Sequence, residues 1–172
     1  MSRNLIIYFS RKGQNYSGGK IVSLEKGNSE MIADFIGQMT GADMFEIRTV
    51  RDYPEDYNEC TEVAGKELKA NARPALEEYL PGLSGYDNIF VVGPCWWGTY
   101  PMAMYTQLEQ LDFHGKKLFP VMTHEGSGMG RSERDLKKIC RGARIVKGLA
   151  IQGSSAAASE QTVAEWIRKH LK

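Results

Sequence analysis

The sequence predicts a doubly wound α/β fold, a three-layer arrangement in which a mostly parallel sheet is covered by helices on both faces. Short apolar runs at residues 5–9 and 89–92 are typical of strands that are buried on both sides. Segments with helical spacing of apolar residues alternate with such strands along the chain. Five strand–helix units joined by right-handed crossovers produce this fold, and we expect a single domain over residues 1–172.

The first half of the chain contains two expected helices. The first has Asn28 or Ser29 as its N-cap and ends at Gly41. A strand follows over residues 43–47, and its alternating pattern indicates a position near the edge of the sheet. The second helix is expected over residues 61–79.

The second half of the chain continues the alternation of strands and helices. We expect a helix at residues 102–111 and then a strand at 117–122. A further helix carries Leu136 on its apolar face. The last strand and the last helix are expected at residues 144–151 and 159–171.

Composition and charge exclude several function classes. The net charge is +1, from 22 Lys and Arg against 21 Asp and Glu, and the two signs are interspersed, so nucleic-acid binding has no support. No apolar run approaches the roughly 20 residues that span a bilayer, and the N-terminal residues lack the apolar region of a signal peptide. We expect a cytoplasmic protein without a membrane partner.

The three cysteines, Cys60, Cys95 and Cys140, form neither a CxxC pair nor a metal-ligand cluster. We therefore expect free thiols and no metal site. Cys95 lies in a candidate ligand loop and could act as a nucleophile. No neighbouring His or Lys in the sequence indicates a lowered thiol pKa, however, and this alternative is the weaker one.

Three loops rich in glycine and small hydroxyl residues follow expected strands, at residues 10–29, 94–100 and 123–128. In a doubly wound sheet such loops meet at the carboxyl ends of the strands, where ligands bind. Asn28 and Ser29 begin a helix, whose free N–H groups and dipole favour a phosphate. Two tryptophans in the second loop indicate a flat aromatic ligand, although core packing is an equally ordinary role for such side chains.

The same three loops resemble those of the flavodoxin-like FMN proteins, and the resemblance covers nearly the whole chain in order. It is carried by Tyr8-Phe9-Ser10 with Gly27-Asn28-Ser29-Glu30, by Pro94-Cys95-Trp96-Trp97-Gly98-Thr99, and by Thr123-His124-Glu125-Gly126-Ser127-Gly128. The resemblance implies a five-stranded parallel sheet in the order 2-1-3-4-5 and non-covalently bound FMN. It places the first loop on the phosphate and the other two around the isoalloxazine ring. The residues assigned to the cofactor in this way are Ser10, Asn28, Ser29, Pro94, Cys95, Trp96, Trp97, Gly98, Thr99, Thr123, His124, Glu125, Gly126, Ser127 and Gly128.

The first loop departs from the flavodoxin pattern because residues 11–26 separate Ser10 from the expected helix. Turn signals beside a short alternating run predict a hairpin insertion there. We expect Asn15 or Tyr16 to fold back towards the phosphate or the flavin edge, and Arg11 or Lys12 to supply positive charge to the phosphate.

A second register for the phosphate loop would use Ser10, Gly13, Gln14 and Asn15. Helical periodicity favours the register in which Asn28 and the residue after it begin the helix.

Roles within the flavin site follow from the resemblance. Trp97 is the first choice for stacking on the flavin, and Tyr100 is a second candidate. Only one of Trp96 and Trp97 is expected to contact the ring, since adjacent residues leaving a strand point in opposite directions. His124 and Glu125 are expected to form hydrogen bonds at the ring edge. His124 is also the one side chain considered for a catalytic role beyond the flavin.

These features favour an NAD(P)H-dependent flavin reductase that passes hydride to a quinone-like acceptor, because the chain is near neutral whereas shuttle flavodoxins are typically acidic. The alternative is an electron carrier that exchanges single electrons with a redox partner protein. A remote third reading is a non-redox binder of a phosphorylated ligand, or a hydrolase using Ser127, although the GxSxG elbow is incomplete. A homodimer is possible for the reductase.

Overall fold

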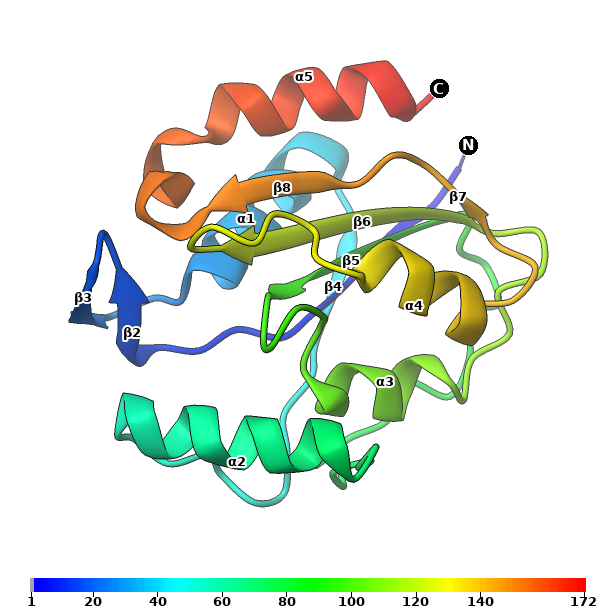
Figure 1. Ribbon diagram of the computed structural model, residues 1–172. Helices are drawn as coiled ribbons and strands as arrows, with labels where there is room; N and C mark the ends of the chain where they lie inside the picture. Colours follow the sequence, from blue (N-terminus) through cyan, green and yellow to red (C-terminus); the bar gives the residue numbers. More distant parts are fainter. Residues whose placement is uncertain (1) are drawn as a thin grey trace.

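The central sheet of the computed structural model, which describes residues 2–172, is entirely parallel (Figure 1). Its hydrogen-bonded order is β4-β1-β5-β6, and both β7 and β8 pair with the far side of β6. If β7 and β8 are taken as one interrupted strand, this is the expected order 2-1-3-4-5. The strands are β1 (Asn4–Tyr8), β4 (Asp43–Glu46), β5 (Asn88–Pro94), β6 (Lys117–His124), β7 (Arg144–Ile145) and β8 (Leu149–Gln152).

Helices cover both faces of the sheet, as Figure 1 shows. One face carries α1 (Asn28–Thr40) and α5 (Glu160–His170), and the 3-10 helix η1 (Gly153–Ala158) leads into α5. The other face carries α2 (Tyr57–Lys69), α3 (Met102–Leu108) and α4 (Ser132–Ile139). The central strands β1, β5 and β6 therefore need apolar side chains on both sides, which explains their continuous apolar runs.

Strand β5 illustrates this packing. Phe90 and Val92 face the α1 and α5 layer, whereas Ile89 and Val91 face the opposite layer. The ring of Phe90 stacks on that of Phe119 in β6, with 4.6 Å between centroids and 23° between ring planes.

The segment expected to form a hairpin contains β2 (Gly13–Ser17) and β3 (Lys20–Leu24), which pair antiparallel. Gly18 and Gly19 connect them, both at positive φ, as a tight two-residue turn requires. We call residues 13–24 the flap. Figure 1 shows it projecting from the end of the sheet at which the parallel strands finish.

Two expected elements have different boundaries in the structure. The second helix covers 57–69 instead of 61–79, because the side chain of Asp56 caps its start and the chain leaves the helix before Asn71, which has a φ of 48°. The last expected strand is divided into β7 and β8. Pro120 lies opposite the interruption and has no N–H to donate, and the carbonyl of Lys147 accepts the indole N–H of Trp166 instead.

Within the described part of the chain, none of the helices combines the length and the apolar character that a membrane span requires.

We predict that Phe90→Ala lowers the free energy of unfolding by about 3–5 kcal/mol, since it removes a fully buried ring from the sheet face. Urea denaturation followed by circular dichroism measures this. Val50→Ala, at a side chain that is 64% exposed, is the control and should change stability by less than about 0.5 kcal/mol. Equal effects of the two changes would contradict the proposed core.

Candidate functional site

The start of α1 lies directly beside the end of β1, although the flap separates them in sequence. Gly27 is the N-cap, so the expectation that Asn28 or Ser29 caps the helix is wrong: these are its first residues. Ser10 Oγ accepts the N–H of Glu30 at 3.0 Å. A Cβ atom on Gly27 would lie 2.0 Å from Ser10 Oγ, so only glycine permits this close return of the chain.

This helix start leaves two backbone donors for a ligand. The first N–H groups of a helix have no acceptor within the helix. The N–H of Glu30 is satisfied by Ser10, and in the described residues no acceptor is found for the N–H groups of Asn28 and Ser29. The Ser29 hydroxyl, in contrast, is buried and hydrogen-bonded to Thr123 Oγ1 at 2.8 Å. The backbone of this turn, more than the serine side chain, is therefore suited to an anion.

A cavity of about 350 Å³ lies between the flap, the start of α2 and the loops that follow β5 and β6. Ten of the residues assigned to the cofactor from the sequence line it. They are Asn15, Tyr16, Asn28, Pro94, Cys95, Trp96, Trp97, Thr123, His124 and Glu125. The remaining lining residues are Arg11, Tyr57, Cys60, Thr61, Ala64 and Gly153. The register with Asn28 at the helix start thus brings the first loop to the same cavity as the other two.

Eight other assigned residues do not line this cavity. They are Ser10, Lys12, Ser29, Gly98, Thr99, Gly126, Ser127 and Gly128. Thr99 is buried, and its hydroxyl is bonded to Tyr105 Oη at 2.5 Å and to Asp135 Oδ2 at 2.7 Å. It holds the second loop to the protein core.

Tyr100 is fully buried, and its selection as a stacking candidate is wrong. Its hydroxyl donates to the carbonyl oxygens of Val91 and Val121, at 3.2 and 2.8 Å. A large aromatic side chain beside a ligand loop has here become part of the core.

Helix α2 supplies the lining residues that the sequence analysis missed. Cys60 and Ala64 are four residues apart and lie on one helix face, and Tyr57 is one turn earlier. The sequence predicts a helix that begins at residue 61, so Tyr57 and Cys60 lie outside the expected helix and could not be assigned to this face. Small residues such as Gly65 on this helix are the sequence signal that it packs closely against another side chain, which here is the Trp97 ring.

The two tryptophans occupy different environments in a tight turn. Trp96 packs edge-on against Phe9 and Tyr53, with centroid distances of 5.1 and 4.9 Å. Trp97 is 58% exposed, and its indole N–H donates to the Thr61 carbonyl on α2 at 2.9 Å. Trp97 has a φ of 58°, an unfavourable conformation for a residue with a Cβ. Such strain is often retained at functional sites.

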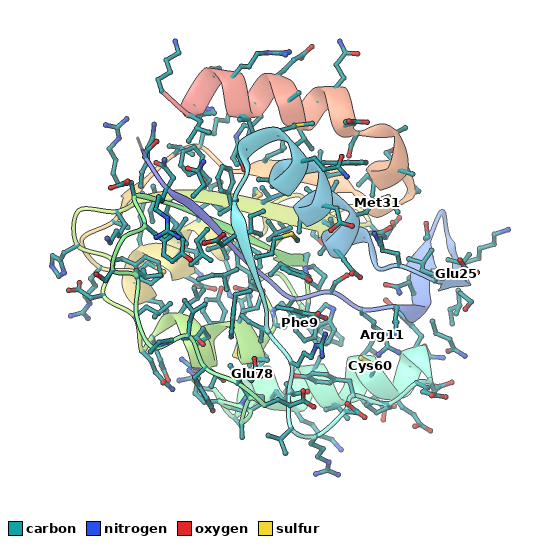
Figure 2. The ribbon with its side chains drawn as sticks, turned by 180° about the vertical axis from the view of Figure 1, so that it is seen from behind. Phe9, Arg11, Glu25, Met31, Cys60 and Glu78 are labelled. Atoms are coloured by element: carbon teal, nitrogen blue, oxygen red, sulfur yellow. The ribbon has the colours of Figure 1, made fainter. Side chains whose placement is uncertain are left out.

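Arg11 fastens the base of the flap. Its guanidinium donates to the carbonyl oxygens of Gln14, Pro54 and Glu55 at 2.8 to 2.9 Å. Figure 2 shows Arg11 between the flap and Cys60 of α2. These three bonds use Nε and Nη2, so Arg11 orders the flap. The N–H groups of Nη1 are not among these donors, and the expected role of Arg11 as a phosphate ligand stays a prediction.

His124 and Glu125 are tied to the backbone around them. His124 Nδ1 accepts the N–H of Gly126 at 2.9 Å, which leaves Nε2 as the protonated nitrogen in a neutral ring. Glu125 accepts from Ser154 N at 3.2 Å and from Gly18 N, at the flap tip, at 3.4 Å.

The two cavity thiols are protonated at neutral pH. Burial raises the pKa of Cys60, and the nearby Arg11 offsets only part of that effect. Burial likewise raises the pKa of Cys95, against hydrogen bonds from Gly98 and Ser127. Neither environment favours the thiolate that a nucleophilic cysteine requires.

Comparison with known proteins gives a family match and several similar structures. A family model described as flavodoxin matches residues 21–170. A proposed flavoprotein from Bacteroides eggerthii DSM 20697 is 23% identical, with a TM-score of 0.78 and coverage of 100% of this chain and 99% of that chain. A second, from Bacteroides uniformis ATCC 8492, is 26% identical, with a TM-score of 0.75 and coverage of 97% and 98%.

A third similar structure is a flavoprotein from Lactobacillus acidophilus NCFM, solved in complex with FMN. It is 15% identical, with a TM-score of 0.66 and full coverage of both chains, so it supports the fold. A search of curated protein sequences gives no significant match.

We predict that Gly27→Ala lowers the free energy of unfolding by about 1–3 kcal/mol, because its Cβ would overlap Ser10 Oγ and the Arg11 carbonyl. Gly82→Ala is the matched control, since a Cβ at residue 82 meets no atom within 4 Å. Thermal denaturation compares the two. Equal melting temperatures would show that the chain does not close at Gly27.

We predict that Cys60 and Cys95 react with iodoacetamide at pH 7 more slowly in the native protein than in urea, because burial raises the pKa of both thiols and so lowers their thiolate fraction. Peptide mass spectrometry resolves the two sites. If Cys95 reacts in the native protein as fast as it does in urea, the hypothesis that Cys95 is a nucleophile would be supported again.

Proposed function

The chain belongs to the flavodoxin family, a family of FMN-binding proteins, and on this premise we propose that it is an FMN-dependent reductase. The proposed donor is NAD(P)H, and the proposed acceptor is a small quinone-like molecule. The observation that carries the proposal is the recessed position of the cavity, between the flap on one side and α2 on the other. A small molecule can enter such a site, whereas walls of this kind hinder close approach by a protein partner.

The residues around the cavity fit FMN. Its volume of about 350 Å³ lies in the range of small-molecule sites, and the exposed ring of Trp97 offers a flat surface to a planar ring. The N–H groups of Asn28 and Ser29 are suited to hold the phosphate. When bound, FMN supplies the hydride and one-electron chemistry that no side chain of the protein can provide.

The protein's own contribution is orientation and control of polarity. Pro94 and Trp97 restrict the ring to one plane, and His124 can offer its Nε2–H to an electron-rich edge. The thiols of Cys60 and Cys95, being protonated, take no covalent part.

The electron carrier is the second candidate, and the same cofactor site serves it. The near-neutral charge of the chain gives little electrostatic guidance to a basic protein partner, which favours the reductase. A hydrolase using Ser127 is disfavoured because His124 Nδ1 is engaged by Gly126 and no base is paired with that serine in residues 2–172.

The experiment is steady-state oxidation of NADPH and NADH by the FMN-loaded protein with a soluble quinone. We expect turnover at least about tenfold above an equal concentration of free FMN, because the site orients donor and cofactor. Turnover no faster than that of free FMN would contradict the reductase function and favour the electron carrier.

We also predict that Asn28→Asp weakens FMN affinity about tenfold, since a carboxylate would face the phosphate at the start of α1. Fluorescence titration of the apoprotein with FMN measures this. Asn71→Asp, which makes the same charge change outside the cavity lining, should bind FMN like the wild type. Unchanged affinity in the Asn28 variant would place the phosphate elsewhere.

A further inference from the structure

The flap carries an aromatic side chain at the outer rim of the cavity. Tyr16 lines the cavity, yet 42% of its surface is exposed. Its ring lies 6.0 Å from that of Tyr57, at the start of α2, with an interplanar angle of 35°. The two tyrosines form an aromatic pair that joins the flap to α2 and leaves apolar surface uncovered.

The base of the flap is firmly docked, which fixes the position of this pair. Arg11 donates to the Pro54 and Glu55 carbonyls, in the segment just before α2. Gln14 Oε1 accepts the N–H of Tyr57 at 2.8 Å and so satisfies a free donor at the helix start. Tyr16 is therefore held against α2.

The tip of the flap is held more weakly than the base. Its contact with the third loop is one long hydrogen bond, 3.4 Å from Gly18 N to Glu125 Oε2. Hydrogen bonds of this length are weak.

The charged side chains around the cavity do not favour a charged acceptor over an uncharged one. Among the described lining residues, Arg11 and Glu125 are the formally charged ones, and their charges are opposite. Both are already hydrogen-bonded to backbone groups. What the rim offers an incoming molecule is aromatic surface, which binds planar rings by stacking.

We propose that Tyr16, supported by Tyr57, determines the specificity of the acceptor subsite by stacking on a planar, uncharged quinone. This inference rests on the proposed reductase function. In the reaction, NAD(P)H is oxidised to NAD(P)⁺, and the quinone gains the hydride equivalent and one proton to become the hydroquinone. The exposed position of Tyr16 assigns it to the exchanging substrate, whereas Asn28 and Thr123 line the cavity from the sheet side.

Calorimetric titration of the oxidised, FMN-loaded protein with 1,4-naphthoquinone, in the absence of an electron donor, tests the subsite directly. Tyr16→Leu and Tyr16→Ala should weaken quinone binding about fivefold, as expected for the loss of one aromatic stack. Tyr16→Phe should stay within about twofold of the wild type, because the ring remains.

Ile21→Ala is the matched control on the same flap. Ile21 is the cross-strand partner of Tyr16 and is 46% exposed, but it does not line the cavity. It should leave quinone affinity unchanged. The affinity of each Tyr16 variant for FMN, measured by fluorescence titration, should also match the wild type.

Wild-type quinone affinity in Tyr16→Leu, no quinone binding by the wild type, or a loss of FMN affinity in the Tyr16 variants would overturn the inference. Turnover with ferricyanide, a small non-planar oxidant, separates it from the proposed function. If Tyr16→Leu oxidises NAD(P)H with ferricyanide and its KM for the quinone is unchanged, the role of Tyr16 is wrong and the reductase function stands. If the protein oxidises NAD(P)H with neither oxidant, the proposed reductase function is wrong. The calorimetric titration then still shows whether Tyr16 contributes to quinone binding.

Discussion

The contact of Gly27 with Ser10 and Arg11 is the constraint on which the site depends. The chain leaves the sheet after β1, forms the flap and returns to nearly the same point, where only a residue without a Cβ fits. Ser10 Oγ then accepts the N–H of Glu30 and fixes the first turn of α1. The helix start consequently lies beside β1 as if no insertion were present, and the N–H groups of Asn28 and Ser29 have no acceptor in the described residues.

The cavity that results has an inner wall and an outer wall of different stability. Buried hydrogen bonds hold the inner wall, such as that between Ser29 and Thr123, and buried pairs are costly to break. The outer wall is the flap, whose tip makes one long bond to Glu125. A site with this division can retain a cofactor against its inner wall while smaller molecules exchange at its outer wall.

Much of this arrangement could be predicted from the sequence because the signals are local. Apolar runs identify strands that are buried on both faces, and Gly18-Gly19 identifies the hairpin turn. Glycine-rich loops in the right order identify the ligand edge.

The remainder depends on contacts between distant residues, which no local pattern contains. Nothing around Tyr100 indicates that its hydroxyl reaches the Val121 carbonyl, and nothing around Arg11 indicates that its donors are used by the segment before α2. The role of α2 as a cavity wall likewise follows from how the helix packs, since its Tyr57 meets the flap only in the folded chain.

A crystal structure of the protein with FMN tests the central claim most directly. We predict the phosphate on the N–H groups of Asn28 and Ser29, and the ring between the loops that follow β5 and β6, with the flap folded over the cavity. A phosphate bound elsewhere, or a flap directed away from an occupied cavity, would contradict it.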